Sequence, residues 1–227
     1  MKEYYYTLKK CPLFKNVDLK SLDEIFNNIN YQMKTFNLNE NIYWENDICD
    51  EINIILEGEI SIQSISSSGE IFRVLHFTKG NIFGEGLIFS DLNEYPISVT
   101  ASEKNTKILI ISKNDLIKAF SINTELTTSF MKILSNRITL LNDKVKILAL
   151  QSIRKKICYF ILKRYKKNEN LKIDIGMNKK TLAESLAIPR PSLSRELIKM
   201  KEEKIIDYDK KYIYILNMNA IELELYN

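Results

Sequence analysis

The sequence predicts an α+β protein with three parts in order: a β-roll of the jelly-roll type, a long helix, and a winged helix-turn-helix. Three observations indicate this order. Five of the six glycines fall within residues 58–86, among short β-rich runs. A heptad repeat free of glycine and proline follows, and the last third carries two helical stretches joined by a proline-containing turn and followed by a hairpin pattern.

The composition is that of an ordinary globular chain, with 227 residues, 45% hydrophobic and 27% charged. Its length suits one large domain or two small ones. It contains no run of eighteen apolar residues, and its start, MKEYYYTLKK, lacks the apolar core of a secretory leader. We therefore expect a cytoplasmic protein that makes no membrane contact.

Cysteine and histidine are too few and too scattered to indicate a metal site or a catalytic pair. Cys11, Cys49 and Cys158 lie far apart and outside any metal-ligand spacing, which predicts reduced, partly buried thiols and no metal site. A redox-sensing thiol is the alternative. The single histidine, His76, lies in the apolar run RVLHFTKG, where a packed side chain is expected. Without a catalytic pair, phosphate-binding loop or metal cluster, the sequence predicts no catalytic residue and no enzyme, and it indicates no particular cofactor.

The basic charge is concentrated in the last third of the chain. Residues 151–227 carry 17 lysines and arginines against 10 acidic residues, a net charge of +7. Residues 1–150 carry 16 against 19, a net charge of −3. A small basic unit beside an acidic one favours a polyanionic partner.

The first 122 residues are the expected β-roll domain. A short amphipathic helix is predicted over 19–29, with Leu19 on its apolar face and Asp18 as its N-cap. From Tyr31 to about Ser112 the sequence changes to short β-rich runs, with three glycines eleven residues apart at Gly58, Gly69 and Gly80. This spacing indicates antiparallel strands separated by turns, with a hairpin turn at SSSGE.

A long helix is expected from about Asn123, because apolar residues recur there at alternating spacings of three and four. These positions, here called the heptad face, are Met131, Leu134, Ile138, Leu141, Val145 and Leu148. Three heptads favour a two-stranded parallel coiled coil joining two protomers, with a helix packed only against its own domain as the alternative. A break near Leu150–Ser152 would form a hinge, so residues 123–151 are the expected dimerisation helix and hinge.

Residues 152–227 carry the pattern of a winged helix-turn-helix. Ser152 and Asn178 are the expected N-caps of two helices, and a third begins at about Pro191. Pro189 cannot extend the helix before it, whereas Pro191 is tolerated in the first turn of the helix that follows. Two strands around a turn at 209–211 complete a wing.

The polar residues at the start of this third helix are the predicted DNA contacts, because its apolar residues would face inward. These contacts are Arg190, Ser192, Ser194 and Arg195. Arginine suits the two acceptors on a guanine edge, and serine bonds phosphates or bases. Glu196 either bonds a neighbouring arginine or accepts from a cytosine amino group. Phosphate contacts are expected at Lys179, Lys180, Lys210 and Lys211.

The order of these motifs resembles the cyclic AMP receptor protein and Fnr (Crp/Fnr) family of bacterial transcription regulators. The motifs are CPLF, the glycine-punctuated roll, KGNIFGE, the long helix, and KKTLAESLAIPRPSLSRELIKMKEEKII with a wing. The resemblance covers nearly the whole chain. It implies a cyclic-nucleotide-binding-like roll that binds an effector, dimerisation through the long helix, an inverted-repeat site on double-stranded DNA, and RNA polymerase as a partner.

The resemblance also places an effector pocket at Gly84, Glu85, Tyr95, Leu141 and Asn142. Cyclic nucleotide binders carry Arg-Ser or Arg-Thr where this chain has Tyr95 and Pro96, and a Thr-Ser pair where it has Leu141 and Asn142. Without the arginine a cyclic phosphate loses a charge-assisted hydrogen bond of roughly 1.5–3 kcal/mol. Three scattered cysteines also do not match the four-thiolate iron-sulfur centre of Fnr-like sensors. We therefore expect an unidentified effector other than cyclic AMP: an apolar or weakly polar ligand, a signal at a cysteine, or none.

The sequence thus predicts a homodimeric, sequence-specific DNA-binding transcription regulator under allosteric control. The alternative is a small-molecule or redox sensor whose winged helix contacts protein rather than DNA. The arginines at the start of the third helix and the net charge of +7 favour DNA.

Overall fold

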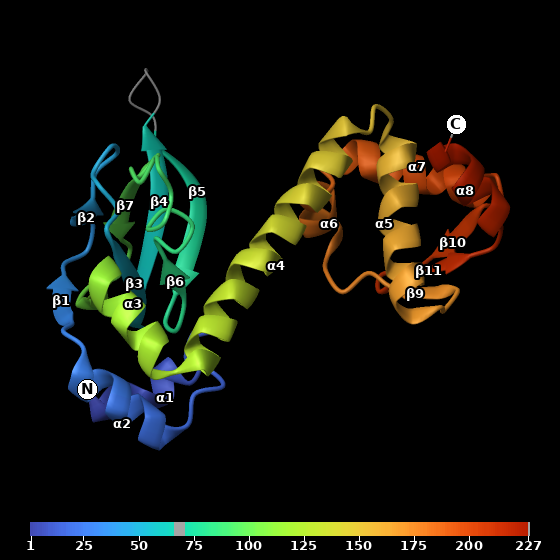
Figure 1. Ribbon diagram of the computed structural model, residues 1–227. Coiled ribbons are helices and arrows are strands. Elements are labelled where there is room, and N and C mark those ends of the chain that lie inside the picture. Colours follow the sequence, from blue (N-terminus) through green and yellow to red (C-terminus); the bar gives the residue numbers. More distant parts are fainter. Residues whose placement is uncertain (66–70, 227) are drawn as a thin grey trace. The chain divides into compact units, whose positions relative to one another are not determined.

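The computed structural model describes residues 1–65 and 71–226, except the side chains of residues 63–65, 71–74 and 226 (Figure 1). The hairpin turn expected at SSSGE, residues 66–70, lies outside the described residues. The chain divides into two compact units, Met1–Arg137 and Ile138–Asn227. Among the described residues no helix is both long enough and apolar enough to cross a lipid bilayer.

The N-terminal unit is a β-roll of two four-stranded antiparallel sheets, as predicted. One sheet has the order β1-β8-β3-β6 and the other β2-β7-β4-β5. The strands are β1 (Gln32–Phe36), β2 (Asn41–Tyr43), β3 (Glu51–Glu57), β4 (Glu59–Ile65), β5 (Ile71–Thr78), β6 (Ile82–Phe83), β7 (Ser98–Ala101) and β8 (Thr106–Ser112). The helical elements are η1 (Lys2–Tyr4), α1 (Tyr5–Leu8), α2 (Leu19–Asn28), α3 (Lys113–Ile122) and the start of α4 (Thr124–Ala149).

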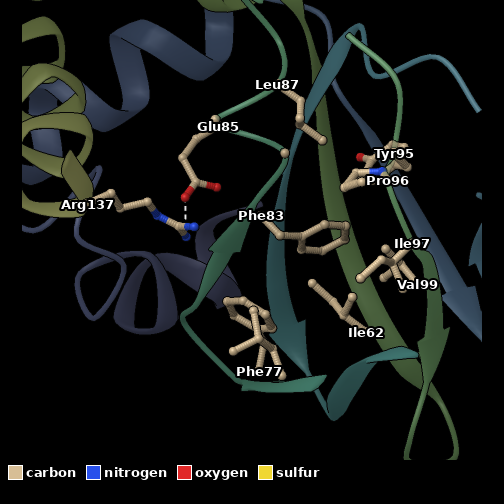
Figure 2. A pocket seen from close by; sticks show the side chains of 13 residues that line it. Ile62, Phe77, Phe83, Glu85, Leu87, Tyr95, Pro96, Ile97, Val99 and Arg137 are labelled. Carbon is tan, nitrogen blue, oxygen red and sulfur yellow. Dashed lines mark ion pairs between the residues drawn. The ribbon is translucent and has the colours of Figure 1, made fainter. Parts of the chain in front are cut away.

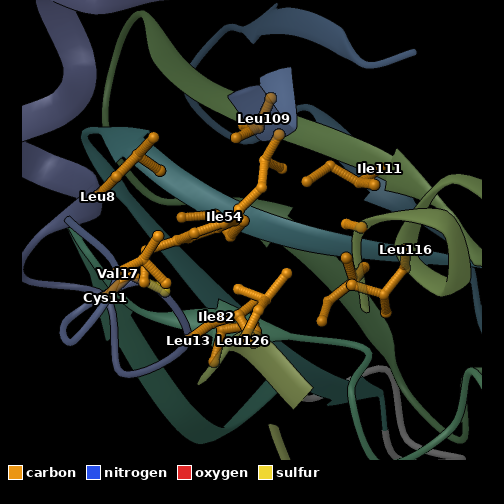
Figure 3. Close-up of a cluster of buried hydrophobic side chains, with 14 of the residues drawn as sticks. Leu8, Cys11, Leu13, Val17, Ile54, Ile82, Leu109, Ile111, Leu116 and Leu126 are labelled. Carbon is orange, nitrogen blue, oxygen red and sulfur yellow. The ribbon is translucent and has the colours of Figure 1, made fainter. Parts of the chain in front are cut away.

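The central strands β3 and β8 are buried on both faces, which explains their continuous apolar sequences. Ile54 and Leu109 point toward the helices, into a cluster with Leu8, Leu116 and Leu126 (Figure 3). The residues next to them along each strand point instead into the space between the two sheets, among them Ile55, Ile108 and Ile110. Gly58 joins β3 to β4 at φ +78°, where a Cβ atom would lie 2.5 Å from Thr106 Oγ1.

Two expectations for single side chains in this unit are wrong. Leu19 is 58% exposed rather than part of the apolar face of α2, although Asp18 caps that helix as predicted, accepting from the backbone N–H of Ser21 at 3.0 Å. His76 is exposed rather than packed, and its Nε2 lies 2.7 Å from Glu59 Oε2. His76 is exposed because β5 is the edge strand of its sheet, so a side chain on β5 has a neighbouring strand on one side only.

All three cysteines are buried and unpaired, as expected for structural thiols. Burial raises the pKa of Cys11 and of Cys158 to about 12, and it also raises the pKa of Cys49. A thiol becomes a good nucleophile only as the thiolate, so these environments oppose the redox-sensing alternative.

The helix α4 ends at Ala149, and α5 (Ile153–Asn168) starts after the predicted break. Ser152 is the N-cap of α5, and its hydroxyl accepts from the backbone N–H of Lys155 at 2.9 Å. Five residues of the heptad face are between 58% and 64% exposed, namely Met131, Ile138, Leu141, Val145 and Leu148. Leu134 instead packs partly against the core of the N-terminal unit.

The C-terminal unit is a winged helix-turn-helix, as predicted. Its elements after α5 are β9 (Lys172–Asp174), α6 (Lys179–Ser185), α7 (Arg190–Glu202), β10 (Ile206–Tyr208), β11 (Tyr212–Ile215) and α8 (Met218–Tyr226). The three strands form an antiparallel sheet of order β10-β11-β9. The sequence did not predict α8, which packs against α5 and adds Ile221 to the core.

Candidate nucleic-acid interface and ligand pocket

The turn between α6 and α7 is shaped by one left-handed residue and one proline. Ala187 has φ +51°, and the backbone N–H of Ile188 donates to the Ala183 carbonyl at 3.0 Å, which closes α6. Pro189 is then the N-cap of α7, which begins at Arg190, one residue before the expected start. Pro191 lies in the first turn of α7, where its missing N–H has no intrahelical acceptor. The left-handed turn was not predicted, because glycine rather than alanine usually marks such a position.

The helix α7 is anchored by its apolar side and presents its polar side outward. Leu193, Leu197 and Met200 are buried, as predicted. Arg190 and Arg195 are exposed, and neither forms an ion pair with a described residue; the Arg195 guanidinium donates only a long hydrogen bond of 3.4 Å to Ser192 Oγ. Ser192 and Ser194 are half-buried on the same helix. Two unneutralised guanidinium groups are therefore available to a polyanion.

Glu196 does not share this outward surface. The Arg154 side chain, from the start of α5, donates from Nε to Glu196 Oε1 at 2.6 Å. The same guanidinium donates two further hydrogen bonds, of 2.6 and 2.7 Å, to the two oxygens of Glu203. Glu196 thus bonds an arginine, as one of the two expectations held, but that arginine is distant in the sequence. Sequence patterns did not single out Arg154, which lay among other basic residues of α5.

The predicted phosphate-contacting lysines lie at the start of α6 and at the tip of the wing. Lys210 and Lys211 are exposed on the turn between β10 and β11, where Asp209 Oδ1 accepts from the backbone N–H of Lys211 at 2.7 Å. Lys180 is exposed, whereas Lys179 is half-buried with its ammonium 4.6 Å from the centroid of the Tyr208 ring. The contact between Lys179 and Tyr208 joins α6 to a strand of the wing.

The N-terminal unit contains a largely apolar cavity of about 230 Å³ (Figure 2). Gly84, Glu85 and Tyr95 contribute to its lining, as predicted. Leu141 and Asn142, predicted for the same pocket, are exposed on α4 and are not among the lining residues. The rest of the lining is Ile62, Leu75, Phe77, Phe83, Gly86, Leu87, Pro96, Ile97, Val99 and Arg137.

One charged pair stands at the edge of this cavity. The carboxylate of Glu85 is 1% exposed and forms an ion pair with the guanidinium of Arg137, which is 44% exposed (Figure 2). Burial raises the pKa of Glu85, while the charge of Arg137 opposes that shift. The sequence pattern did not single out Arg137, because a charged residue next to a heptad position is ordinarily exposed to solvent beside the helix pair.

Tyr95, which the family resemblance would place at the phosphate-binding arginine, lines the cavity and belongs to a buried polar network. Its ring stacks on Tyr43 with centroids 4.3 Å apart, and its hydroxyl accepts from Asn53 Nδ2 at 3.1 Å. A Cβ at Gly84 would lie 3.3 Å from the Tyr95 hydroxyl, so glycine allows the close approach. A tyrosine side chain carries no positive charge, so Tyr95 cannot supply the ionic contact that an arginine would make with a phosphate.

Two sequence families match this chain in tandem. The cyclic nucleotide-binding domain matches residues 33–123, and the Crp-like helix-turn-helix domain matches residues 155–223, together more than two thirds of the chain. The chain belongs to the Crp/Fnr family. It is a transcription regulator of the Crp/Fnr type, with an N-terminal roll and a C-terminal DNA-binding motif.

Individual relatives agree with this assignment. The Anaerobic regulatory protein of Bacillus subtilis (strain 168) is 28% identical over 174 residues, which are 74% of this chain and 72% of that protein. The Global nitrogen regulator of a Nostoc species is 22% identical over 192 residues, covering 81% of this chain and 84% of that protein. The Catabolite Activator Protein of Thermus thermophilus has the same fold, with a TM-score of 0.55 and 17% identity over 95% of this chain and 98% of that one.

Proposed function

We propose that this Crp/Fnr regulator acts as a homodimer that binds an inverted-repeat DNA site, under the control of a ligand other than cyclic AMP. The observation that carries the proposal is the exposed start of α7, where Arg190 and Arg195 have no ionic partner among the described residues. Arginine at the start of such a helix bonds the O6 and N7 atoms of guanine in the major groove. We assign base contacts to Arg190, Ser192, Ser194 and Arg195, and phosphate contacts to Lys179, Lys180, Lys210 and Lys211.

The exposed heptad face supports the dimer. Apolar side chains that are about 60% exposed in one chain, such as Ile138 and Leu141, become buried when two copies of α4 pair. Each protomer then contributes one α7 helix to a major groove. In this scheme residues 1–122 sense the effector, 123–151 dimerise and act as a hinge, and 152–227 bind DNA, with RNA polymerase as the partner at promoters.

The β-roll cavity supports a small, mostly apolar effector. Its volume of about 230 Å³ is below the roughly 300–1,000 Å³ typical of sites for larger ligands. Its lining is hydrophobic except at one end, where Glu85 and Arg137 can bond a single polar group. Leu141 and Asn142 lie outside the lining of this cavity, so the proposed site rests on Glu85, Tyr95 and Arg137.

Selection of bound fragments from the source genome tests the DNA proposal. The expected motif is an inverted repeat whose half-sites lie about 34–36 Å apart, one helical turn. Recovery of fragments without any palindrome, or binding that does not weaken with salt, would count against a dimer reading DNA. Mass spectrometry of molecules extracted from the purified protein tests the effector, for which a small apolar compound is expected and a cyclic nucleotide would contradict the proposal.

A further inference from the structure

A second cavity of the N-terminal unit, of about 310 Å³, has a polar and basic lining. It lies between the segment 10–16 and the first half of α4. Its lining holds three lysines, two asparagines, a serine, a proline and an isoleucine, and no carboxylate: Lys10, Pro12, Lys15, Asn16, Ser129, Lys132, Ile133 and Asn136. It shares no residue with the apolar cavity of the roll.

The hydroxyl of Ser129 is a buried polar group of this cavity. Ser129 is 3% exposed, and its Oγ has no hydrogen-bond partner among the described residues. A buried serine or threonine in a helix can bond the carbonyl four residues earlier, as the Thr128 hydroxyl does with the Thr124 carbonyl at 3.0 Å, but Ser129 does not. Buried hydroxyl groups in native proteins are nearly always satisfied, so an orphaned one that lines a cavity indicates a partner from outside the chain.

The three lysines of the cavity are free to neutralise an anion. None of Lys10, Lys15 and Lys132 forms an ion pair with a carboxylate in the described part of the chain, and the Lys10 ammonium lies 4.5 Å from the centroid of the Tyr6 ring. The neighbouring Lys9, in contrast, donates to the carbonyl oxygens of Lys15 and Val17 at 2.6 and 2.7 Å. Lys9 therefore holds the 15–17 loop in shape beside the cavity, before any ligand binds.

Dimerisation through the heptad face leaves this cavity open. At 100° per residue, Ser129, Lys132 and Asn136 lie on one side of α4, and the heptad-face residues Met131 and Ile138 lie on the opposite side. A partner helix packed on the heptad face would not cover the lysines.

We propose that this cavity binds a phosphorylated small molecule carrying at least two negative charges. Lysine ammonium groups act as point charges for phosphate oxygens, and the Ser129 hydroxyl and the asparagine amides supply directed donors to a tetrahedral oxyanion. The ligand joins the N-terminal segment to α4, and so acts on the helix that carries the heptad face. The site is separate from the apolar effector cavity and does not depend on its occupant.

Calorimetric titration of the dialysed, DNA-free full-length protein with pyrophosphate tests the site. We expect one saturable site per chain, weakened about tenfold or more in Lys132→Gln and in Ser129→Ala, because each removes a charge-assisted or directed hydrogen bond. Lys20→Gln, an exposed lysine of α2 outside the cavity, is the matched control and should bind like the parent protein. Circular dichroism and melting temperature in the absence of anion establish that each variant is folded; Lys132 is exposed, so its substitution leaves the core intact.

Three results would overturn the proposal. The first is the absence of saturable binding. The second is weakening by Lys20→Gln or Lys211→Ala equal to that by Lys132→Gln, which would assign the signal to general attraction or to the DNA-binding surface. The third is citrate binding as tightly as pyrophosphate, which would assign the cavity to carboxylate ligands. None of these results bears on DNA recognition, which is measured separately.

Discussion

The guanidinium of Arg154 binds both oxygens of Glu203 through hydrogen bonds of 2.6 and 2.7 Å, and its Nε binds Glu196. The first residues of α5, directly after the break that ends α4, are thereby tied to the middle and the end of α7. Hydrogen bonds to Glu203 and Glu196 raise the pKa of Arg154. The hydrogen bonds from Arg154 are in turn the largest cause of the lowered pKa of Glu203. One arginine at the proposed hinge thus helps to hold α7, the helix that we propose contacts DNA.

Arg154→Ala should weaken DNA binding without changing the preferred half-site. The substitution leaves the largely buried Glu196 carboxylate unpaired, at a cost of about 1–3 kcal/mol in the free energy of unfolding, but removes no base contact. Denaturant unfolding and site selection measure the two effects, with Lys167→Ala on the exposed side of α5 as the control. A changed consensus sequence would mean that Arg154 reads bases itself.

Arg195→Ala and Lys211→Ala should impair DNA binding in different ways. Loss of Arg195 should remove the proposed base contact, worth about 1–3 kcal/mol, and relax the choice of base at one position of the half-site. Loss of Lys211 should weaken all sequences alike and lower the salt slope by about one counterion. Binding isotherms at several salt concentrations, on the selected site and on single-base variants of it, separate the two. Identical behaviour of both variants would refute this division of roles.

Arg137→Ala should destabilise the N-terminal unit most at neutral pH. Burial already raises the pKa of Glu85 above its ordinary value of 4.5, and removal of the opposing arginine charge raises it further. A carboxyl group with a raised folded-state pKa contributes stability that is present below its unfolded pKa and lost as pH rises through its folded pKa. We expect a loss of about 2 kcal/mol at pH 7, less than the roughly 3–5 of a fully buried pair because solvent screens the half-exposed Arg137.

Melting temperatures of the parent protein and of Arg137→Ala, measured from pH 7 downward, check this sign. The deficit should shrink as the pH falls through the pKa of Glu85. Arg137→Lys keeps the charge and should retain most of the stability at pH 7. A deficit that grows toward acid pH would contradict the assignment to Glu85.

Charges on the heptad face should dissociate the proposed dimer. Ile138→Asp with Val145→Asp places two carboxylates where the pairing of two α4 helices would bury apolar side chains. Light scattering should then give the mass of one chain, against two chains for the parent protein. Leu140→Asp is the matched control, because Leu140 is 61% exposed on the same helix but lies off the heptad face. Dissociation by Leu140→Asp alone would place the interface elsewhere.

The three thiols should be inert in the native protein. Cys11 and Cys158, with pKa values raised to about 12 by burial, have almost no thiolate at neutral pH. Titration with a chromogenic disulfide should detect few thiols before denaturation and three afterwards. One rapidly reacting thiol in the folded protein would restore the redox-sensing hypothesis.

The predictions from sequence that proved correct concern features set within a few residues. Each of the helix caps Asp18, Ser152 and Asn178 bonds a backbone N–H three residues later, so a short window suffices to find it. The prolines that bound the turn before α7 act on their immediate neighbours in the same way. Short β-rich runs separated by regularly spaced glycines likewise predicted the strands of the roll, and the heptad repeat predicted the long helix α4.

The sequence by itself thus determined the order of the three parts, the family, and the polar side of α7. Only the tertiary structure decided that Glu85 pairs with Arg137, that Arg154 holds Glu203 from 49 residues away, and that His76 on an edge strand is exposed. It also brought Lys10 and Ser129 to one cavity. The physical reason is that caps, turns and helical faces are local, whereas the burial and pairing of a charge depend on which distant segments the fold brings beside it.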